Sequence, residues 1–328
     1  MAAAVGEPTT ARAVWFLAPY HVEVADVELA ALGAEQLRIR CEFSGISAGT
    51  EMLVYRGEVD PDLARDDTLA ALAGTFAYPL TYGYSAVGVV EASRCGIAEG
   101  ERVFAFHPHQ NVFDVRSADV VRVGDTDARA ATLFPLVETA LQLTLDAGIR
   151  FGEQVVVLGL GAVGILTAVL LARSGSVVVG SDTRRGRREV ARACGIEAVD
   201  AADLPAGADI VVEATGNPDA LGPALDLLRN EGVALVASWY GSKPVTLPLG
   251  AAFHRRRLEL RSSQVSTVGW RAVRWDRARR RDVARALLRE LPLDALVTHT
   301  FPFERAPEAY AAVDRGEDGL VHMALSYA

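Results

Sequence analysis

Cysteine and lysine are scarce in this sequence. The three cysteines, Cys41, Cys95 and Cys194, stand far apart, and Lys243 is the only lysine. A disulfide framework needs an even set of cysteines and a cysteine-rich zinc site needs closely spaced ones, so we expect neither. Few and unclustered cysteines are typical of free thiols in a reducing compartment, which predicts a cytoplasmic protein.

An excess of positive charge is also absent, because the net charge is −9. Proteins that bind nucleic acid are usually basic, so we expect no nucleic-acid partner. The first 14 residues have neither a basic n-region nor an apolar h-region, so we expect no signal peptide. The uncharged run Val155–Ala172 is long enough to span a membrane. Its three glycines, however, predict a turn between a buried strand and a helix, so we expect no membrane partner.

The chain of 328 residues, 50% of them hydrophobic, predicts about two domains. Residues 1–125 contain short β-like runs with partial alternation, which predicts a β-rich, barrel-like domain. Residues 126–263 alternate apolar strands with helical patterns, which predicts an α/β domain with a doubly wound parallel sheet. Residues 264–328 are too few for a third domain, and we expect them to return to the first.

The most informative stretch is 154–182, QVVVLGLGAVGILTAVLLARSGSVVVGSD. Its order of strand, glycine turn, helix, strand and acid predicts dinucleotide binding. Gly159 permits the tight turn, Gly161 lets the pyrophosphate approach the backbone, and Gly164 lets the helix pack close to the strand. Asp182 would accept hydrogen bonds from the ribose hydroxyls. The cofactor-binding residues predicted here are Gly159, Gly161, Ala162, Val163, Gly164, Asp182, Thr183, Arg184, Ala214, Thr215 and Gly216.

The choice between NAD and NADP depends on the residues around this acid. Asp182 would repel a 2′-phosphate, whereas Arg184, Arg185, Arg187 and Arg188 could attract one. The position of the acid favours NAD, and NADP remains the alternative.

Six strand-like runs should form the parallel sheet. They are Val155–Leu158, Val177–Val179, Glu197–Val199, Asp209–Ala214, Val233–Ala237 and Leu258–Leu260. We expect the edge of this sheet near Val245–Leu247, because Pro248 just beyond cannot donate to a central ladder. An open edge leaves backbone groups unpaired, so we predict a homodimer formed through it.

A second basic run follows the predicted sheet. Its members are Arg271, Arg274, Arg277 and Arg279–Arg281. Such runs are usually solvated helix faces, and recognition of an anionic substrate is the alternative.

The order of these parts resembles the medium-chain dehydrogenase/reductase superfamily across essentially the whole chain. The matching motifs are Gly100-Glu101-Arg102-Val103, the GLGAVG turn, DIVVEATG, and Val297-Thr298-His299 with Ala309-Tyr310. The resemblance implies a GroES-like catalytic domain followed by a Rossmann domain. SGISAGTE at 44–51 and YPLTYGYSAVGVVE at 78–91 are similar to a narrower subgroup, which includes bacteriochlorophyllide dehydrogenase and related alcohol dehydrogenases.

The chain departs from this family at its zinc ligands. Zinc-dependent members place a Cys where this chain has Ser47, and Gly-His-Glu where it has Gly83-Tyr84-Ser85, and a later ligand falls near Phe134-Pro135. A catalytic zinc needs three N, S or O protein ligands and an open position, which these residues do not supply. The family's four-cysteine zinc cluster is absent as well, so we predict a zinc-free protein.

One metal-like pair remains at His107 and His109, whose rings would lie on the same side of an extended chain. It has no third ligand nearby in sequence, and a loop at the rim of the cleft is the alternative.

The resemblance implies a nicotinamide-dependent oxidoreductase that interconverts an alcohol and a ketone or aldehyde on a small organic substrate. Reduction of a conjugated C=C bond and cofactor binding without turnover remain open alternatives. Without zinc, a hydroxyl group or an ordered water must supply the proton. Tyr84 and Ser47 should face the nicotinamide, with Thr50 as a relay, although Tyr84 could also merely fill the vacated zinc space. The predicted catalytic residues are Tyr84, Ser47, Thr50 and Glu138, and Thr139 is predicted to hold the nicotinamide carboxamide.

Overall fold

The computed structural model describes residues 9–65 and 70–327, which form two compact units. Unit 1 runs to Phe134 and resumes at His299–Arg315 and again from Met323. Unit 2 comprises Pro135–Thr298 and Gly316–His322. Each unit therefore contains segments that are far apart in sequence.

Unit 1 is built on two β-sheets. The smaller is antiparallel, with the order β2-β1-β4. The larger has the order β15-β16-β3-β5-β6-β8, with β7 also pairing β3, and only its β15–β16 pair is parallel. The strands are β1 (Thr9–Ala18), β2 (His21–Leu29), β3 (Gln36–Ile46), β4 (Leu80–Thr81), β5 (Ala86–Ser93), β6 (Arg102–Ala105), β7 (Val112–Arg116), β8 (Val120–Arg122), β15 (His299–Pro302) and β16 (Met323–Ser326). Its helices are α1 (Thr50–Arg56), α2 (Ala128–Ala131) and α10 (Ala306–Arg315), while α3 (Phe134–Ala147) begins at the last residue of the first segment.

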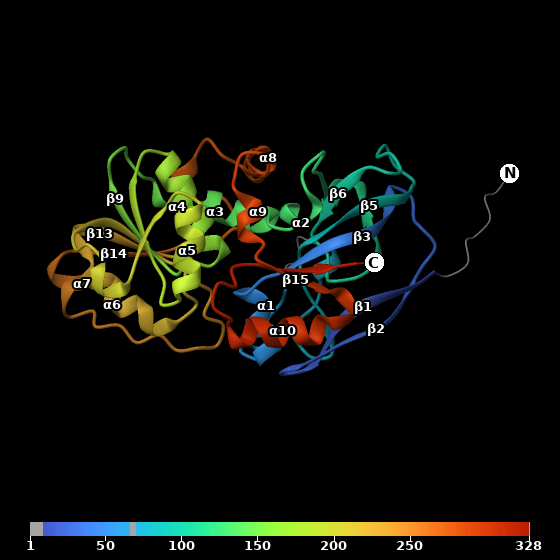
Figure 1. Ribbon diagram of the computed structural model, residues 1–328, viewed down its shortest axis with the longest axis horizontal. Coiled ribbons are helices and arrows are strands. Elements are labelled where there is room, and N and C mark those ends of the chain that lie inside the picture. Colours follow the sequence, from blue (N-terminus) through green and yellow to red (C-terminus); the bar gives the residue numbers. More distant parts are fainter. Residues whose placement is uncertain (1–8, 66–69, 328) are drawn as a thin grey trace. The chain divides into compact units, whose positions relative to one another are not determined.

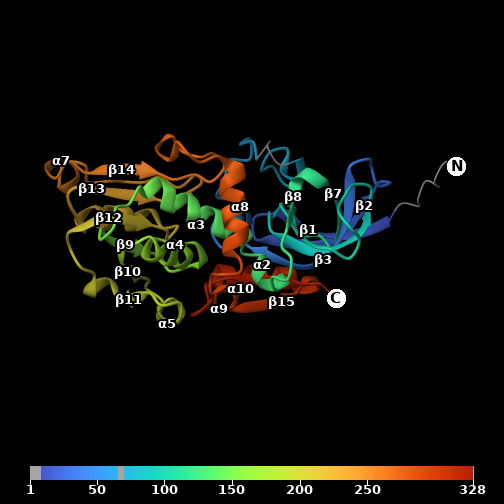
Figure 2. The same cartoon turned by 90° about the horizontal axis from the view of Figure 1, so that it is seen from above.

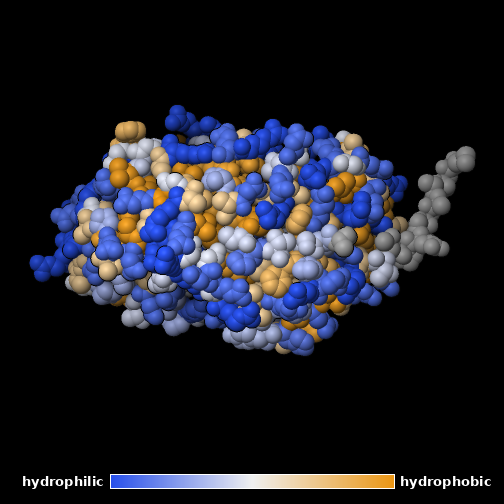
Figure 3. Space-filling model, viewed as in Figure 1, coloured by the Kyte–Doolittle hydropathy of each residue, from blue (hydrophilic) through white to orange (hydrophobic). Residues whose placement is uncertain are grey.

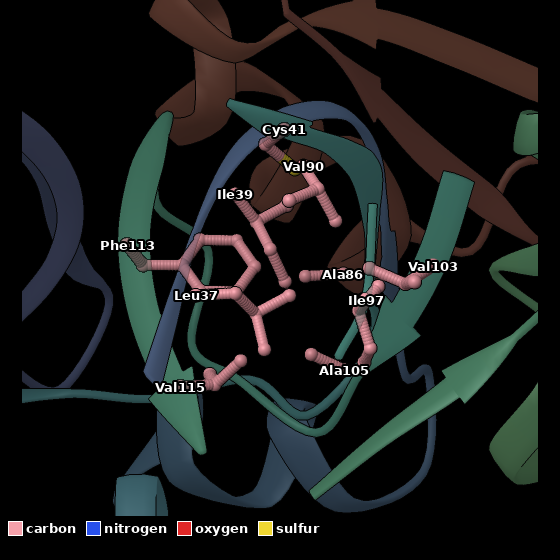
Figure 4. Close-up of a cluster of buried hydrophobic side chains, with 10 residues drawn as sticks. All are labelled: Leu37, Ile39, Cys41, Ala86, Val90, Ile97, Val103, Ala105, Phe113 and Val115. Atoms are coloured by element: carbon pink, nitrogen blue, oxygen red, sulfur yellow. The ribbon is translucent and has the colours of Figure 1, made fainter. Parts of the chain in front are cut away.

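Buried side chains from the larger sheet of unit 1 pack together in one hydrophobic cluster. Alternate residues of β3, namely Leu37, Ile39 and Cys41, point into it, because successive side chains of a strand face opposite sides. Figure 4 shows these side chains meeting those of β5, β6 and β7. The cluster consists of Leu37, Ile39, Cys41, Ala86, Val90, Ile97, Val103, Ala105, Phe113 and Val115. The predicted β-rich domain is therefore present.

Unit 2 contains a six-stranded parallel sheet in the order β11-β10-β9-β12-β13-β14. This order is that of a doubly wound dinucleotide-binding sheet, and its strands can be followed in Figure 2. The six predicted strands are confirmed as β9 (Gln154–Leu158), β10 (Val177–Ser181), β11 (Glu197–Val199), β12 (Ala208–Glu213), β13 (Leu228–Val236) and β14 (Glu259–Ser262).

Helices cover both faces of this sheet. Gly164 of α4 lies against Val157 of β9, whereas the neighbouring Val156 packs with Leu221 and Leu225 of α6 on the opposite face. The helices of unit 2, labelled in Figure 1, are α3 from Pro135 onward, α4 (Ala162–Arg173), α5 (Arg185–Ala193), α6 (Leu221–Asp226), α7 (Ala252–Arg255), α8 (Arg277–Leu287) and α9 (Leu293–Leu296). The fold is therefore α/β, with a Rossmann unit and a GroES-like unit.

The prediction of the sheet edge was wrong. Val245–Leu247 belong to no strand, and β14 is the last strand in the order. Pro244 and Pro248 flank the predicted segment, and each lacks the N–H group that a parallel ladder needs.

The compact units have bounds different from the predicted domains. Residues 264–298, expected to return to the first domain, lie in unit 2. Helix α8 explains this placement, because its buried Arg280 donates to Gln142 Oε1 of α3 at 2.7 Å. Only His299–Arg315 and the residues from Met323 return to unit 1, where His299 begins β15.

The uncharged run Val155–Ala172 is divided between β9, the glycine turn and α4. Within the described ranges no helix is long and apolar enough to cross a membrane. Polar residues cover much of the face shown in Figure 3, with apolar residues exposed between them.

Candidate functional site

Three glycines shape the turn between β9 and α4. Gly159 has a φ of +89°, and a Cβ there would lie 2.6 Å from the carbonyl oxygen of Ala214. A Cβ on Gly164 would lie 1.9 Å from the Gly159 oxygen. A Cβ on Gly161 would have nothing within 4 Å, so the backbone there is open to a ligand. Two glycines thus permit close backbone packing and the third leaves free space, as the sequence predicts.

Helix α4 begins beside this open position. Gly161 is its N-cap residue and provides no side-chain acceptor, so the first N–H groups, those of Ala162 and Val163 among them, have no cap from it. Free N–H groups and the positive end of the helix dipole favour a phosphate. The turn therefore has the shape and polarity for a pyrophosphate.

Asp182 is fixed in place by backbone groups at the end of β10. Its Oδ2 accepts from the Leu160 N–H at 2.8 Å and its Oδ1 from the Arg184 N–H at 2.9 Å. The side chain is 7% exposed, and Arg187 Nη1 lies 3.6 Å from Oδ2. The acid is thus held beside the glycine turn, where an adenosine ribose would lie, and Thr183 next to it is exposed.

The arginines after Asp182 contact other groups of unit 2. Arg185 pairs with Glu189 at 2.8 Å. Arg187 Nε donates to the Leu320 carbonyl at 2.8 Å. Arg188 donates to the Asp182 carbonyl at 2.6 Å and lies 3.3 Å from Asp200. These contacts reduce the positive charge available to a ligand.

Glu213, a buried acid, is the last residue of β12 and lies at the carboxyl end of that strand. It accepts from the Thr215 N–H at 2.7 Å and from the Tyr240 hydroxyl at 2.5 Å. Burial and then Glu213 raise the pKa of Tyr240 well above its usual value. The Gly216 N–H donates to Ser238 Oγ at 2.9 Å, so the predicted loop Ala214–Gly216 is fixed by contacts that sequence reasoning missed. The acidic residue inside the apolar run DIVVEA was the signal.

In unit 1 the predicted hydroxyl groups come together. Tyr84 forms hydrogen bonds with the Ser47 and Thr50 side chains. Burial raises the pKa of Tyr84 to about 12, nearby Glu51 adds to the rise, and the two hydrogen bonds oppose it. The phenol therefore keeps its proton at neutral pH.

A buried polar network lies next to this group, and the sequence did not predict it. Glu51 is 0% exposed and accepts from the Ser47 N–H at 2.9 Å and from the Tyr310 hydroxyl at 2.5 Å. His109 Nε2 lies 2.9 Å from Glu51 Oε2, and His109 Nδ1 lies 2.6 Å from Ser44 Oγ. Ser44 Oγ in turn lies 2.8 Å from the Tyr327 hydroxyl. The network anchors the Ser47 backbone.

Gly83 lets the Tyr84 loop approach this network. Its φ is +120°, and a Cβ there would lie 2.6 Å from His109 Cδ2. Glycine is therefore required between the loop and the imidazole.

His107 and His109 contact different groups in unit 1. His107 stacks on Phe113 with ring centroids 4.0 Å apart, and its Nδ1 lies 2.9 Å from the Pro108 oxygen. Burial lowers the pKa of His107 to about 4. His109 instead pairs with Ser44 and Glu51, and the backbone bends at His109.

The donor set of unit 1 does not fit a catalytic zinc. Ser47 and Tyr84 present hydroxyl groups at two of the family's ligand positions, and neutral hydroxyls are poor ligands for this ion. Throughout the described part of the chain, no group of three or more His, Cys, Asp or Glu side chains could hold a metal ion.

Glu138 lies in a charged cluster inside unit 2. Its Oε1 is 3.6 Å from Arg280 Nε and 3.9 Å from Arg281 Nε, and Glu138 and Arg280 are both buried. Burial raises the pKa of Glu138, and Arg281 and Arg280 oppose the rise. The basic run is thus not wholly a solvated face, since Arg280 is internal. Thr139 donates to the Pro135 carbonyl of its own helix at 2.9 Å.

Known proteins share this architecture. Residues 135–321 match the family model described as the glucose dehydrogenase C-terminus. The chain is 31% identical over 301 residues to 2-desacetyl-2-hydroxyethyl bacteriochlorophyllide A dehydrogenase of Cereibacter sphaeroides, which covers 84% of this chain and 86% of that one. The chain belongs to the medium-chain dehydrogenase/reductase superfamily. The resemblance seen in its motifs is thereby confirmed, and the protein is an NAD(P)-dependent oxidoreductase of the medium-chain type.

Solved structures of this superfamily share the fold. The acetophenone reductase of Geotrichum candidum, in complex with NAD, superposes with a TM-score of 0.78 at 16% identity over 98% of both chains. A putative zinc-binding dehydrogenase from Sinorhizobium meliloti, bound to NADP, gives 0.76 at 18% identity over 97% of this chain and 99% of that one.

Proposed function

We propose that this medium-chain oxidoreductase interconverts an alcohol and a ketone or aldehyde on a small organic substrate, with NAD as its cofactor and without zinc. The observation that carries the proposal is the hydrogen-bonded group of Tyr84, Ser47 and Thr50, in which Tyr84 and Ser47 stand where zinc-dependent members have ligands. The Cereibacter relative is named for a hydroxyethyl group, which is an alcohol, and this supports the substrate class.

The cofactor would be held by unit 2. The N–H groups at the start of α4 would bind the pyrophosphate beside Gly161, and Asp182 would accept from the ribose hydroxyls. Ala214–Gly216, fixed by Glu213 and Ser238, would border the same edge. When bound, the nicotinamide supplies or takes up the hydride.

Tyr84 would supply the proton to a carbonyl oxygen that is being reduced, and would take it back in the reverse direction. A phenol with a pKa of about 12 holds its proton at neutral pH and can donate it as negative charge develops on the substrate oxygen. The Ser47 and Thr50 hydroxyls orient the phenol, and Glu51 orients the Ser47 backbone.

Glu138, which the sequence predicts as a catalytic residue, has a structural role in this proposal. Because its carboxylate is paired with Arg280 and Arg281, it would hold α3 to the segment around α8 and not act on the substrate. The hydroxyl of Thr139 is already bonded within α3, so it would bind a carboxamide only as an additional contact.

The test is the absorbance of NADH in the presence of matched ketones, aldehydes and enones, and of NAD with the corresponding alcohols. Turnover of carbonyls and alcohols supports the proposal. Turnover of enones alone would favour C=C reduction, and binding of NADH without turnover of any compound would favour a cofactor-binding protein.

We also propose a cytoplasmic homodimer. Strand β14 is the last strand of the sheet order and carries Leu260 with 41% of its surface exposed. An unpaired edge with an exposed apolar residue invites pairing with a second copy. Light scattering that gives a monomer mass at micromolar concentration would reject the dimer, and Leu260→Lys should weaken it.

A further inference from the structure

We propose that Asp318 selects NAD over NADP by placing a negative charge at the start of α5, next to the ribose-binding acid. This inference rests on the proposed use of a nicotinamide dinucleotide. It concerns the segment Gly316–His322, which belongs to unit 2 although it follows α10 of unit 1.

Helix α5 has no N-terminal cap of its own. Its N-cap residue is Arg184, whose side chain has no acceptor and forms no cap hydrogen bond. The Gly186 N–H, in the first turn, donates to Asp318 Oδ1 at 2.9 Å. A carboxylate from 132 residues away thus occupies the position where this helix would attract an anion.

The backbone of the segment lies in direct contact with α5. A Cβ on Gly186 would lie 2.6 Å from the Gly319 nitrogen, and a Cβ on Gly316 would lie 1.9 Å from Arg184 Nη2. Gly316 and Gly319 have φ values of +62° and +78°, a region that glycine adopts most easily. Close packing therefore holds Asp318 at the helix and Arg184 against the segment.

The charges of Asp182, Asp318 and Arg184 all act on Arg187. Arg187 Nη1 lies 3.6 Å from Asp182 Oδ2, and its Nε donates to the Leu320 carbonyl. Burial lowers the pKa of Arg187, and Asp182 and Asp318 oppose this effect while Arg184 adds to it. The two guanidinium groups are thus balanced by two carboxylates.

An NADP molecule would bring a phosphate to the 2′-oxygen beside Asp182. With Asp318 present, that phosphate meets the carboxylate of Asp182, which directly follows β10, and the carboxylate of Asp318 in the Gly316–His322 segment. Without the charge of Asp318, Arg184 and the N–H groups of α5 would favour it. The sequence showed the arginines but could not show the distant carboxylate that offsets them.

Asp318→Asn separates the charge from the capping role. Asparagine keeps an Oδ1 acceptor for the Gly186 N–H but removes the negative charge. A purely structural cap would tolerate this change with both dinucleotides bound as before. Asp318→Glu keeps the charge and should keep the selectivity.

The experiment measures the dissociation constants of NADH and NADPH by fluorescence titration of the full chain. The wild type should bind NADH more tightly. Asp318→Asn should tighten NADPH binding about tenfold with little change for NADH, since like charges several ångströms apart near a surface repel by about this much. Asp282→Asn, which removes a charge from an exposed residue of α8, serves as the control and should change neither constant.

An unchanged NADPH-to-NADH ratio in Asp318→Asn, or an equal change in Asp282→Asn, would overturn the inference. So would a wild type that prefers NADPH. Because the titration needs no substrate, a failure to turn over alcohols or carbonyls counts against the proposed function alone. A wild type that binds neither dinucleotide would overturn both.

Discussion

The glycine turn of unit 2 and the hydroxyl group of unit 1 differ in how the chain specifies them. Backbone sterics within six residues, Gly159–Gly164, shape the turn, and a local motif suffices to predict it. The geometry around Tyr84 depends on side chains from β3, α1, α10 and the loop at His109. A local motif therefore predicts the proposed cofactor site, whereas the proposed acid–base group depends on contacts between distant residues.

The two regions also differ in what a substitution disturbs. In the turn, an added methyl group meets rigid backbone. In unit 1, a lost carboxylate leaves buried donors unpaired, which costs free energy of folding. The following predictions test this contrast, from the largest expected effect to the smallest.

Tyr84→Phe should lower the turnover number by roughly 10²–10⁴-fold, because it removes the proposed proton donor. NADH affinity should stay nearly constant, since the residues proposed to bind the cofactor lie in unit 2. Tyr20→Phe, at a tyrosine that is 59% exposed, is the matched control and should leave turnover unchanged. Steady-state kinetics gives the turnover number of each variant. Equal turnover numbers for Tyr84→Phe and Tyr20→Phe would show that Tyr84 is not the proton donor.

Glu51→Ala should reduce the free energy of unfolding by about 3–5 kcal/mol, as expected when one partner of a buried polar pair is lost. The Ser47 N–H, the Tyr310 hydroxyl and His109 would all lose their acceptor. Glu23→Ala, at an exposed position of β2, should change stability by less than about 0.5 kcal/mol. Urea unfolding measures the free energy of unfolding of both variants. Equal values for Glu51→Ala and Glu23→Ala would show that the network does not stabilise unit 1.

Gly164→Ala and Gly161→Ala should separate folding from binding in unit 2. The first places a methyl group on the Gly159 carbonyl and should cost about 1–3 kcal/mol of stability. The second meets no atom within 4 Å, so stability should hold while NADH binding weakens. Thermal unfolding and NADH titration check the pair, and a stable Gly164→Ala protein with normal affinity would contradict the packing argument.

The ionisation of Tyr84 should appear at high pH. Its pKa is raised from 10.0 to about 12, so the folded state keeps a proton that the unfolded chain loses above pH 10. The contribution of Tyr84 to stability is therefore complete below pH 10 and falls as the pH rises toward 12. The absorbance of tyrosinate near 295 nm is measured against pH for the wild type and for Tyr84→Phe, and the difference between the two curves is the ionisation of Tyr84. A midpoint of that difference near pH 10 would contradict the raised pKa.

Much of unit 2 could be predicted from the sequence, because period, glycine spacing and the acid after β10 are local signals. The position of the sheet edge at β14 could not be predicted, since it depends on which apolar segment pairs with β13. Arg280 looked like part of a solvated run, yet its pairing with Glu138 and Gln142 buries it. Likewise, the sequence offered His109 as a metal ligand, because its partner Glu51 is 58 residues away.

The central claim is that carbonyl chemistry in this protein uses a tyrosine hydroxyl and no zinc. The most direct measurement is the rate of NADH-dependent reduction of an accepted ketone after dialysis against a strong chelator, with metal content determined on the same sample. The account predicts full activity in protein without stoichiometric zinc. Activity that is lost on chelation and restored by added Zn²⁺ would contradict it.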